Sequence, residues 1–319
     1  MAHSDVHPTH RFQKWQVWPG SYDNPLPDGN YPFPGEPSRL FSRTTPVASM
    51  GSCFAREIKR VLIERGYRYL TEEAWHPASK HASAAWERTY NLFSMRQIFE
   101  YTFGDWKPQL RWWLAPRSGK AQDPYRRIIV YDSQAAAEED FERHRQCSLK
   151  ALTTAEVLFL TLGLTELWED REDGSVICLP SGPYVTEGGD MSRYRFRVSR
   201  YAENYRQLER IYALMKAHNP SCTIVVTVSP VHLWATFRED SDVISASCNS
   251  KSTLRALVDE FVASHQGMLY FPSYEMATIY GPLMGHLPFS EGREPFHVNA
   301  AMVEYIMEQF LDHYGEKGG

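Results

Sequence analysis

The chain has 319 residues, of which 43% are hydrophobic and 23% are charged, so it can bury the core of a globular protein. Its net charge of −5 disfavours a nucleic-acid-binding protein, and its apolar runs are too short for membrane insertion. The five cysteines are scattered, without the spacing of a disulfide framework or a zinc site. Since the first residues also show no secretory signal pattern, we expect a cytoplasmic protein without a metal.

The predicted elements begin after an irregular segment. Residues 1–44 are rich in Pro, Gly, Trp and Tyr, which predicts that they wrap around the protein without folding by themselves. From residue 45 on, the hydrophobic periodicity alternates between that of strands and that of helices. The expected elements, in chain order, are a strand at 45–50, a helix at 53–65, a strand at 67–70, helices at 94–104 and 133–150, a strand at 156–163, a helix at 199–218, a strand at 223–231, a helix at 254–265, a strand at 269–274 and a helix at 303–314.

Residues 105–132 interrupt this alternation. Two β-prone pieces flank a polar turn with Pro and Gly, which predicts an inserted hairpin or lid. Trp113 and Arg127 lie in this insertion, where an aromatic face could stack on a sugar and a guanidinium could hold a phosphate. The alternative is a hairpin that packs onto the body and leaves its arginines in solvent.

The alternation predicts an α/β fold, with residues 45–319 as one domain. Strands buried on both faces form a mostly parallel sheet that helices cover on both sides, a three-layer α/β/α sandwich. Ligands of such sheets bind at the carboxyl ends of the strands. The polar residues expected at that edge are Ser52, Cys53, Gly163, Thr165, Glu166, His232 and His297. For His232, an ordinary hydrogen-bonded loop histidine is the competing interpretation.

Ser52 and Cys53 are two candidate nucleophiles at a junction between a strand and a helix. A helix N-terminus presents unpaired N–H groups and the positive end of the helix dipole, and both stabilise a thiolate. The same N–H groups can receive the oxyanion that forms when a carbonyl is attacked. A serine hydroxyl gains less from the dipole and needs a partner base.

His297 is the candidate base, and Glu294 lies three residues before it. A carboxylate at this spacing can orient the imidazole and stabilise the imidazolium. The alternative is an exposed loop histidine beside a surface carboxylate, because short acid-x-x-His matches arise by chance. No Gly-x-Gly-x-x-Gly or Walker-type loop is present, which disfavours a nucleotide cofactor.

The stretch SKSTLRA at 250–256 contains Lys251 and Arg255, four residues apart at an expected helix start. Two cations there could bind an anionic group. The simpler interpretation is that Ser250 or Ser252 caps the helix.

Four motifs in order carry a family resemblance. They are GSCFA at 51–55, LTLGLTELW at 160–168, VSPVHLWATF at 228–237 and SKSTLRA at 250–256. With these motifs the chain resembles the GSCFA family, from about residue 40 to 312. That family is assigned to the SGNH (GDSL-like) hydrolase superfamily, so the resemblance implies a flavodoxin-like, SGNH-type sheet.

The resemblance also implies roles for individual residues. In SGNH enzymes a Gly-Asp-Ser elbow carries the nucleophile in its third position, which Cys53 occupies here, and Ser52 takes the place of the aspartate. The Gly-x-Asn-Asp oxyanion block corresponds to residues 163–166, with Thr165 in place of the asparagine. Asn91 is the best candidate for the central glycine block.

The resemblance and the residues together predict acyl transfer. The Asp-x-x-His of the superfamily becomes Glu294 and His297, so Cys53 would attack an ester or thioester while His297 relays the proton. The Cys53 N–H, with Thr165 or Asn91, would stabilise the oxyanion. The acceptor is water or a sugar hydroxyl, no cofactor is required, and acyl-coenzyme A is a candidate donor.

The second hypothesis is a catalytically silent module that binds a glycan or another ligand. The altered Gly-x-Asn-Asp block favours it, whereas the surviving elbow and acid-x-x-His disfavour it. In both hypotheses the partner is a small molecule or a glycan and not a nucleic acid. The oligomeric state is not predicted.

Overall fold

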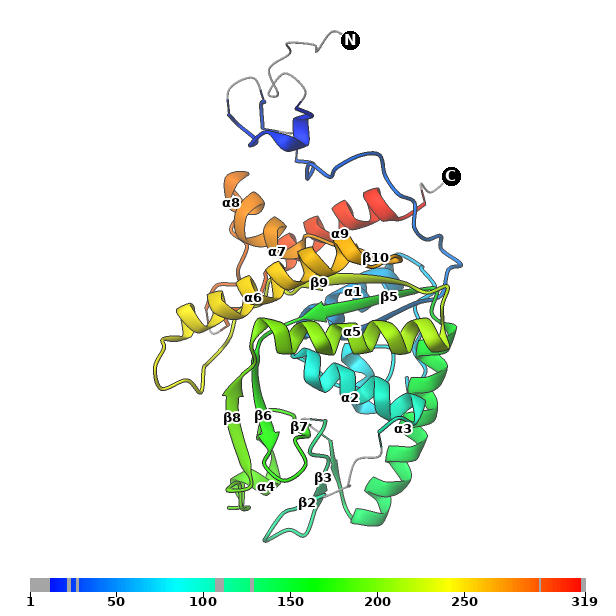
Figure 1. Cartoon of the computed structure of the whole chain (residues 1–319), viewed down its shortest axis with the longest axis vertical. Coiled ribbons are helices and arrows are strands. Elements are labelled where there is room, and N and C mark those ends of the chain that lie inside the picture. Colours follow the sequence, from blue (N-terminus) through cyan, green and yellow to red (C-terminus); the bar gives the residue numbers. More distant parts are fainter. Residues whose placement is uncertain are drawn as a thin grey trace.

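The centre of the fold is a four-stranded parallel sheet. The computed structural model describes residues 12–21, 24–26, 29–106, 112–126, 129–292 and 294–316. The strand order is β1-β5-β9-β10 (Figure 1). The strands are β1 (Val47–Gly51), β5 (Val157–Leu162), β9 (Thr223–Val228) and β10 (Met268–Tyr270).

The strand expected at 67–70 is reduced to a single residue pair. Tyr69 makes an isolated parallel bridge to Val47, on the free edge of β1. Counting this bridge as the remnant of an edge strand, the sheet has the flavodoxin-like order 2-1-3-4-5. The mostly parallel sheet expected from the sequence is confirmed.

Helices cover both faces of the sheet and complete the three-layer sandwich (Figure 1). Along β5, Leu158 and Leu160 pack on one face, and Val157 and Phe159 on the other, because successive side chains of a strand point in opposite directions. The helices on the first face are α2 (Leu92–Phe103), α3 (Gln134–Thr154), α5 (Tyr201–His218) and α6 (Val243–Ser264). Those on the second face are α1 (Cys53–Glu64) and α9 (Ala300–Tyr314).

Helix α6 begins well before the expected start. Its N-cap is Asp242, whose carboxylate accepts a hydrogen bond from the Ser245 amide, whereas the sequence predicted a helix from 254 and a cap at Ser250 or Ser252. The prediction was wrong because residues 245–252 are mostly Ser, Cys and Asn, so the first turns of the helix show no apolar periodicity in the sequence. Ser250 and Lys251 are therefore buried residues inside a helix.

Two small antiparallel sheets lie together below the main sheet in Figure 1. One is formed in the insertion at 105–132, from β2 (Trp113–Leu114), β3 (Ala121–Gln122) and β4 (Val130–Tyr131). The sequence did not predict the other, formed by β6 (Glu166–Asp170), β7 (Val176–Ile177) and β8 (Tyr194–Val198). This second sheet follows directly from the 163–166 block, so it extends the protein beyond the edge where the candidate site lies.

The described part of 12–44 is mostly irregular, and only its later portion, from Tyr31 to Phe41, packs against α9. The Tyr31 amide donates to Gln309 Oε1 at 2.7 Å, and Arg39 Nη1 donates to the Gly315 carbonyl at 2.7 Å. The remaining short helices are η2 (Lys14–Gln16), η3 (Pro77–His81), α4 (Pro183–Thr186), α7 (Ser273–Glu275), η4 (Met276–Tyr280) and α8 (Gly281–Leu283). Among the described helices none is both long and apolar enough to cross a bilayer.

Candidate active site

The turn between β1 and α1 is held tightly against β5. Gly51 has φ 138°, and a Cβ atom there would lie 2.3 Å from the Thr161 carbonyl oxygen, so only glycine fits. The next amide, of Ser52, donates to Thr161 Oγ1 at 2.7 Å. The elbow therefore fixes the start of α1 at the carboxyl edge of the sheet.

Ser52 is the N-cap of α1 and has little access to solvent. Its side chain is 3% exposed, and its Oγ accepts a hydrogen bond from the Phe54 amide at 3.3 Å. The same Oγ lies 3.0 Å from Thr161 Oγ1. The hydroxyl is thus engaged in capping the helix and in joining it to β5.

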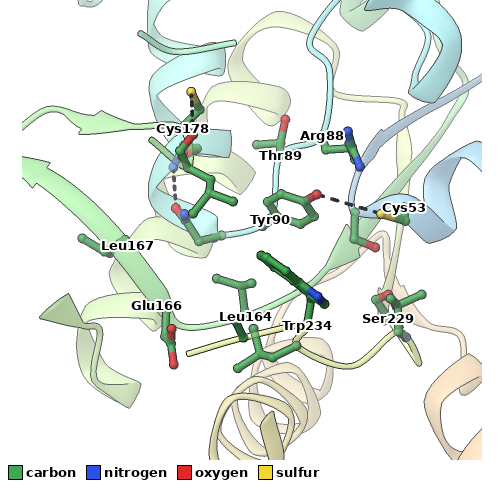
Figure 2. A pocket seen from close by; sticks show the side chains of 18 of the residues that line it. Cys53, Arg88, Thr89, Tyr90, Leu164, Glu166, Leu167, Cys178, Ser229 and Trp234 are labelled. Atoms are coloured by element: carbon green, nitrogen blue, oxygen red, sulfur yellow. Dashed lines mark hydrogen bonds between the residues drawn. The ribbon is translucent and has the colours of Figure 1, made fainter. Parts of the chain in front are cut away.

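Cys53 is the first residue of α1, half-buried in a cleft, and its Sγ lies 4.0 Å from the Tyr90 hydroxyl (Figure 2). Burial raises the pKa of the thiol, but a hydrogen bond with His297 and the positive charge of Arg88 outweigh it and leave the pKa lowered. Within the described part of the chain, its backbone N–H has no acceptor. Cys53 therefore combines a thiol poised to ionise with a free amide beside it.

His297 comes from the loop before α9 and meets Cys53 across the cleft. The hydrogen bond with Cys53 raises the pKa of His297 against the effect of burial, and Glu294 adds to the rise. His297 Nδ1 lies 3.1 Å from Glu294 Oε2, which leaves Nε2 for the thiol. The Glu294 side chain is 67% exposed, so its charge is well screened.

Arg88 is a site residue that the sequence did not indicate. It lies above Cys53 in Figure 2, and its Nε donates to Glu87 Oε1 at 3.2 Å. Glu87 is fully buried and has φ 58°, a left-handed conformation that is uncommon for a residue with a side chain. The buried carboxylate thus holds the guanidinium beside the sulfur, where no local sequence pattern would have placed it.

Asn91 and Gly163 both lie in the cleft wall, and the Tyr90 carbonyl links them. The Gly163 and Leu164 amides donate to that carbonyl at 2.9 and 3.0 Å, so neither is available to a substrate. Asn91 caps α2 through Oδ1, which accepts from the Ser94 amide at 2.9 Å. Among the described residues this is the only hydrogen bond of the Asn91 side chain, so its nitrogen is left to donate to a ligand.

Thr165 does not reach the cleft. Its side chain is completely buried, and both its amide and its hydroxyl are bonded to Ser250 Oγ, at 3.2 and 3.0 Å. The next residue in α6, Lys251, donates to the Gly163 carbonyl at 2.7 Å. The SKSTLRA stretch therefore holds residues 163–165 in place through these hydrogen bonds. Its Ser250 and Lys251 are buried and not on the surface.

The other candidates differ in position. Glu166 lines the cleft and accepts from Thr236 Oγ1 at 2.5 Å, and His232 lines it with Nδ1 3.1 Å from Ser247 Oγ. Trp113 is 2% exposed, and its indole N–H donates to the Tyr194 hydroxyl at 2.8 Å, so it belongs to a small core and not to a lid surface. Arg127 lies outside the described residues.

The cleft has a volume of about 410 Å³, which is ample for a small organic ligand. In Figure 2, Cys53 and Arg88 lie at one end and Glu166 and Leu167 at the other. No group of three or more His, Cys, Asp or Glu side chains in the described ranges is arranged to hold a metal ion. The arrangement can supply a nucleophile, a proton carrier and N–H donors for an oxyanion.

A family model of the GSCFA family matches residues 46–310. The chain belongs to the GSCFA family. This confirms the resemblance carried by the four motifs. No curated protein gives a significant match to the chain.

Several solved structures are distantly similar to this GSCFA protein. One is described as a putative platelet activating factor from Streptococcus pneumonia (14% identity, TM-score 0.29), and covers 50% of this chain and 59% of its own. A second is the salicylyl-acyltransferase SsfX3 from a tetracycline biosynthetic pathway (13% identity, TM-score 0.29). The match covers 51% of this chain and 39% of that one. A third is a putative GDSL-like lipase from Parabacteroides merdae (13% identity, TM-score 0.35). The match covers 86% of this chain and 96% of that one. The chain thus spans less than two thirds of the first two, and at these scores none of the likenesses bears on the reaction.

Proposed function

We propose that the protein is an acyl-transfer enzyme in which Cys53 attacks the acyl group and His297 carries the proton. The observation that carries this proposal is that both side chains line the same cleft, where the pKa of the thiol is lowered and that of the imidazole is raised, each by the other. Both shifts favour the ion pair of a thiolate and an imidazolium over the neutral pair. Ser52 is less suited to attack, because its hydroxyl caps α1.

The reaction has two steps that share a thioester intermediate. The Cys53 thiolate attacks the acyl carbon, a C–S bond forms, and an electron pair of the carbonyl moves onto its oxygen. When the oxyanion collapses, the bond to the leaving alcohol or thiol breaks, and His297 gives that group its proton. His297 then takes a proton from water or an acceptor hydroxyl, whose oxygen attacks the thioester and releases the Cys53 thiolate.

The oxyanion is stabilised in this proposal by the backbone N–H of Cys53 and the side-chain amide of Asn91. Both belong to the cleft wall, and neither has another acceptor among the described residues. Thr165 is left out of the oxyanion site, because its hydroxyl is bonded to Ser250. Preorganised donors of this kind contribute more to the rate than flexible ones.

The donor is an O-acyl ester or a thioester such as acyl-coenzyme A, and no resident cofactor takes part. The acceptor is water in an esterase or a carbohydrate hydroxyl in an O-acyltransferase. Sugar hydroxyls both donate and accept hydrogen bonds, and Arg88 and Glu294 offer both kinds of partner beside Cys53. A cytoplasmic location stays a prediction, supported by the absence of disulfides among the described residues.

The test is the covalent intermediate. Intact-mass measurement after brief exposure to a 4-nitrophenyl acyl ester should show one acyl adduct on the wild type and on Ser52→Ala, and none on Cys53→Ala. His297→Ala should lose most turnover, by a factor on the order of 10²–10⁴. An adduct that persists in Cys53→Ala and disappears in Ser52→Ala would make Ser52 the nucleophile. If the wild-type protein shows neither an adduct nor turnover with a range of esters and thioesters, acyl transfer is excluded. The second hypothesis, a catalytically silent ligand-binding module, then remains.

A further inference from the structure

Two cavities meet at Cys53. The cleft of about 410 Å³ extends from the sulfur toward the β6-β7-β8 sheet, and a second cavity of about 330 Å³ opens on the side of α1 and η3. The residues that line both are Cys53, Arg88, Val231, Glu294 and His297. The nucleophile and its base therefore stand at the junction between two spaces.

The cleft is mainly apolar away from Cys53. Its walls come from β6, β7 and β8 and from the segment 231–237, and Leu164 and Trp234 lie between the two ends in Figure 2. The apolar lining includes Leu164, Leu167, Ile177, Phe196, Ala235 and Phe237. Such a lining gains most from burying hydrocarbon.

The second cavity has a mainly polar lining of mixed charge, to which Phe54, Val298 and Val303 add apolar surface. Arg56 and Glu57 contribute an ion pair of 3.0 Å, and Arg56 is 54% exposed at the cavity. His81, 8% exposed, also lines it, and His81 Nδ1 has no hydrogen-bond partner in the described part of the chain. Positive and negative groups are balanced here, so the lining suits a neutral group with many hydroxyls better than an anion or a cation.

We infer that the cleft binds the acyl group of the substrate and that the second cavity binds its alcohol part. The inference rests on the proposed function, in which the carbonyl carbon sits at Cys53. The two substituents of that carbon, the acyl chain and the ester oxygen, leave it in different directions, as the two cavities do. The substrate class is therefore an ester that joins a medium-length aliphatic or an aromatic acyl group to a polyhydroxylated alcohol.

The reverse orientation is less favourable. In the apolar part of the cleft, hydroxyls would be buried against side chains such as Leu167 and Phe196, which offer no hydrogen bonds in place of those to water. The acyl chain, in turn, would displace solvent from Arg56 and Glu57 without replacing its hydrogen bonds. An acetyl group would leave most of the cleft unfilled.

The acyl side is tested with 4-nitrophenyl esters from acetyl to decanoyl, which share one leaving group. We expect kcat/KM to rise by about fourfold for each added methylene over the first part of the series. Ala235→Trp, which adds bulk to the cleft wall, should lower the ratio of octanoyl to acetyl kcat/KM by about tenfold or more. Ile244→Trp is the matched control, since Ile244 is 80% exposed and lines neither cavity.

The alcohol side is tested with an octanoyl ester of glucose against 4-nitrophenyl octanoate. Arg56→Gln and His81→Ala should raise KM for the sugar ester by about tenfold relative to the aryl ester and leave the chain-length ratio unchanged. Arg65→Gln, at the far end of α1, should change neither.

Two results would overturn the inference. One is a preference for acetyl over longer chains that Ala235→Trp leaves unaltered. The other is an equal effect of Arg56→Gln on the sugar and aryl esters. If Cys53→Ala abolishes turnover while either result is found, the proposed function stands and only the assignment of the two cavities fails. If Cys53→Ala keeps turnover, the proposed function itself fails.

Discussion

The Nζ atom of Lys251 donates a hydrogen bond of 2.7 Å to the carbonyl oxygen of Gly163, directly behind the candidate site. Lys251 is 1% exposed, and burial lowers its pKa to about 7, while the negative charge on Cys53 acts to raise it. A buried cation thus fixes the backbone of the cleft wall and lies in the field of the thiolate. Lys251 is a positioning residue, since it acts through Gly163 and through charge.

Lys251→Met should slow the alkylation of Cys53 by iodoacetamide at about pH 6.5 by about threefold. The charges of Lys251 and Cys53 interact, so loss of the positive charge should raise the pKa of the thiol, and the effect should be moderate because Lys251 is not hydrogen-bonded to the sulfur. The measurement is the rate of Cys53 modification against pH, followed by mass spectrometry, with Arg255→Gln on the same helix as control. An unchanged pH profile, with activity lost only through unfolding, would reduce Lys251 to a packing role.

Lys251 should also make the stability of the protein depend on pH. In the folded protein it loses its proton near pH 7, whereas in the unfolded chain it does so near 10.5. Between these values the unfolded state binds more protons, so the free energy of unfolding rises with pH. Urea unfolding at about pH 7 and about pH 9.5 should show the wild type gaining stability relative to Lys251→Met at the higher pH. A constant difference would mean that Lys251 stays charged when buried.

The elbow could be predicted because all of its signals are local. Gly51, Ser52 and Cys53 adjoin one another, and the amphipathic helix that follows shows where the strand must end. The acid-x-x-His pair was found in the same way, from a separation of three residues. These short-range patterns were enough to place Cys53 and His297, the candidate nucleophile and base, at one sheet edge, once a parallel sheet was assumed.

Arg88 could not be found by such reasoning, and Lys251 was noted only as a cation at an expected helix start, not as a buried residue. A charged residue in a helix or loop usually faces solvent, and nothing adjacent to these two indicates that a fully buried Glu87 or the Gly163 carbonyl will partner them. Thr165 shows the converse failure. Its position in the motif indicated an oxyanion donor, but its hydroxyl is hydrogen-bonded to Ser250, which lies in a helix more than eighty residues away in the sequence. The β6-β7-β8 sheet was missed because β7 has only two residues and because β8 pairs with β6, and not with β7, its neighbour in the sequence.

Arg88→Gln should have a larger effect on Cys53 than Lys251→Met. Its charge and its hydrogen bond both lower the pKa of the thiol, so their loss should slow Cys53 alkylation at about pH 6.5 by about tenfold or more. Arg88→Lys keeps the charge and should recover part of the rate. Cys147, whose thiol has its pKa raised by burial, is the internal reference in the same spectra. If both variants alkylate at the wild-type rate, His297 alone activates the thiol.

Glu294→Gln should reduce kcat/KM by less than about fivefold. Its carboxylate is 67% exposed and 3.1 Å from His297 Nδ1, and an exposed ion pair of this kind contributes at most about 1 kcal/mol. A buried carboxylate in the same role contributes far more, because it also fixes the tautomer of the imidazole. The measurement is the pH–rate profile for a 4-nitrophenyl ester, in which the limb due to His297 should move to lower pH, since the carboxylate raises the pKa of that histidine. A loss of several hundredfold would show instead that the loop before α9 closes around Glu294 when substrate binds.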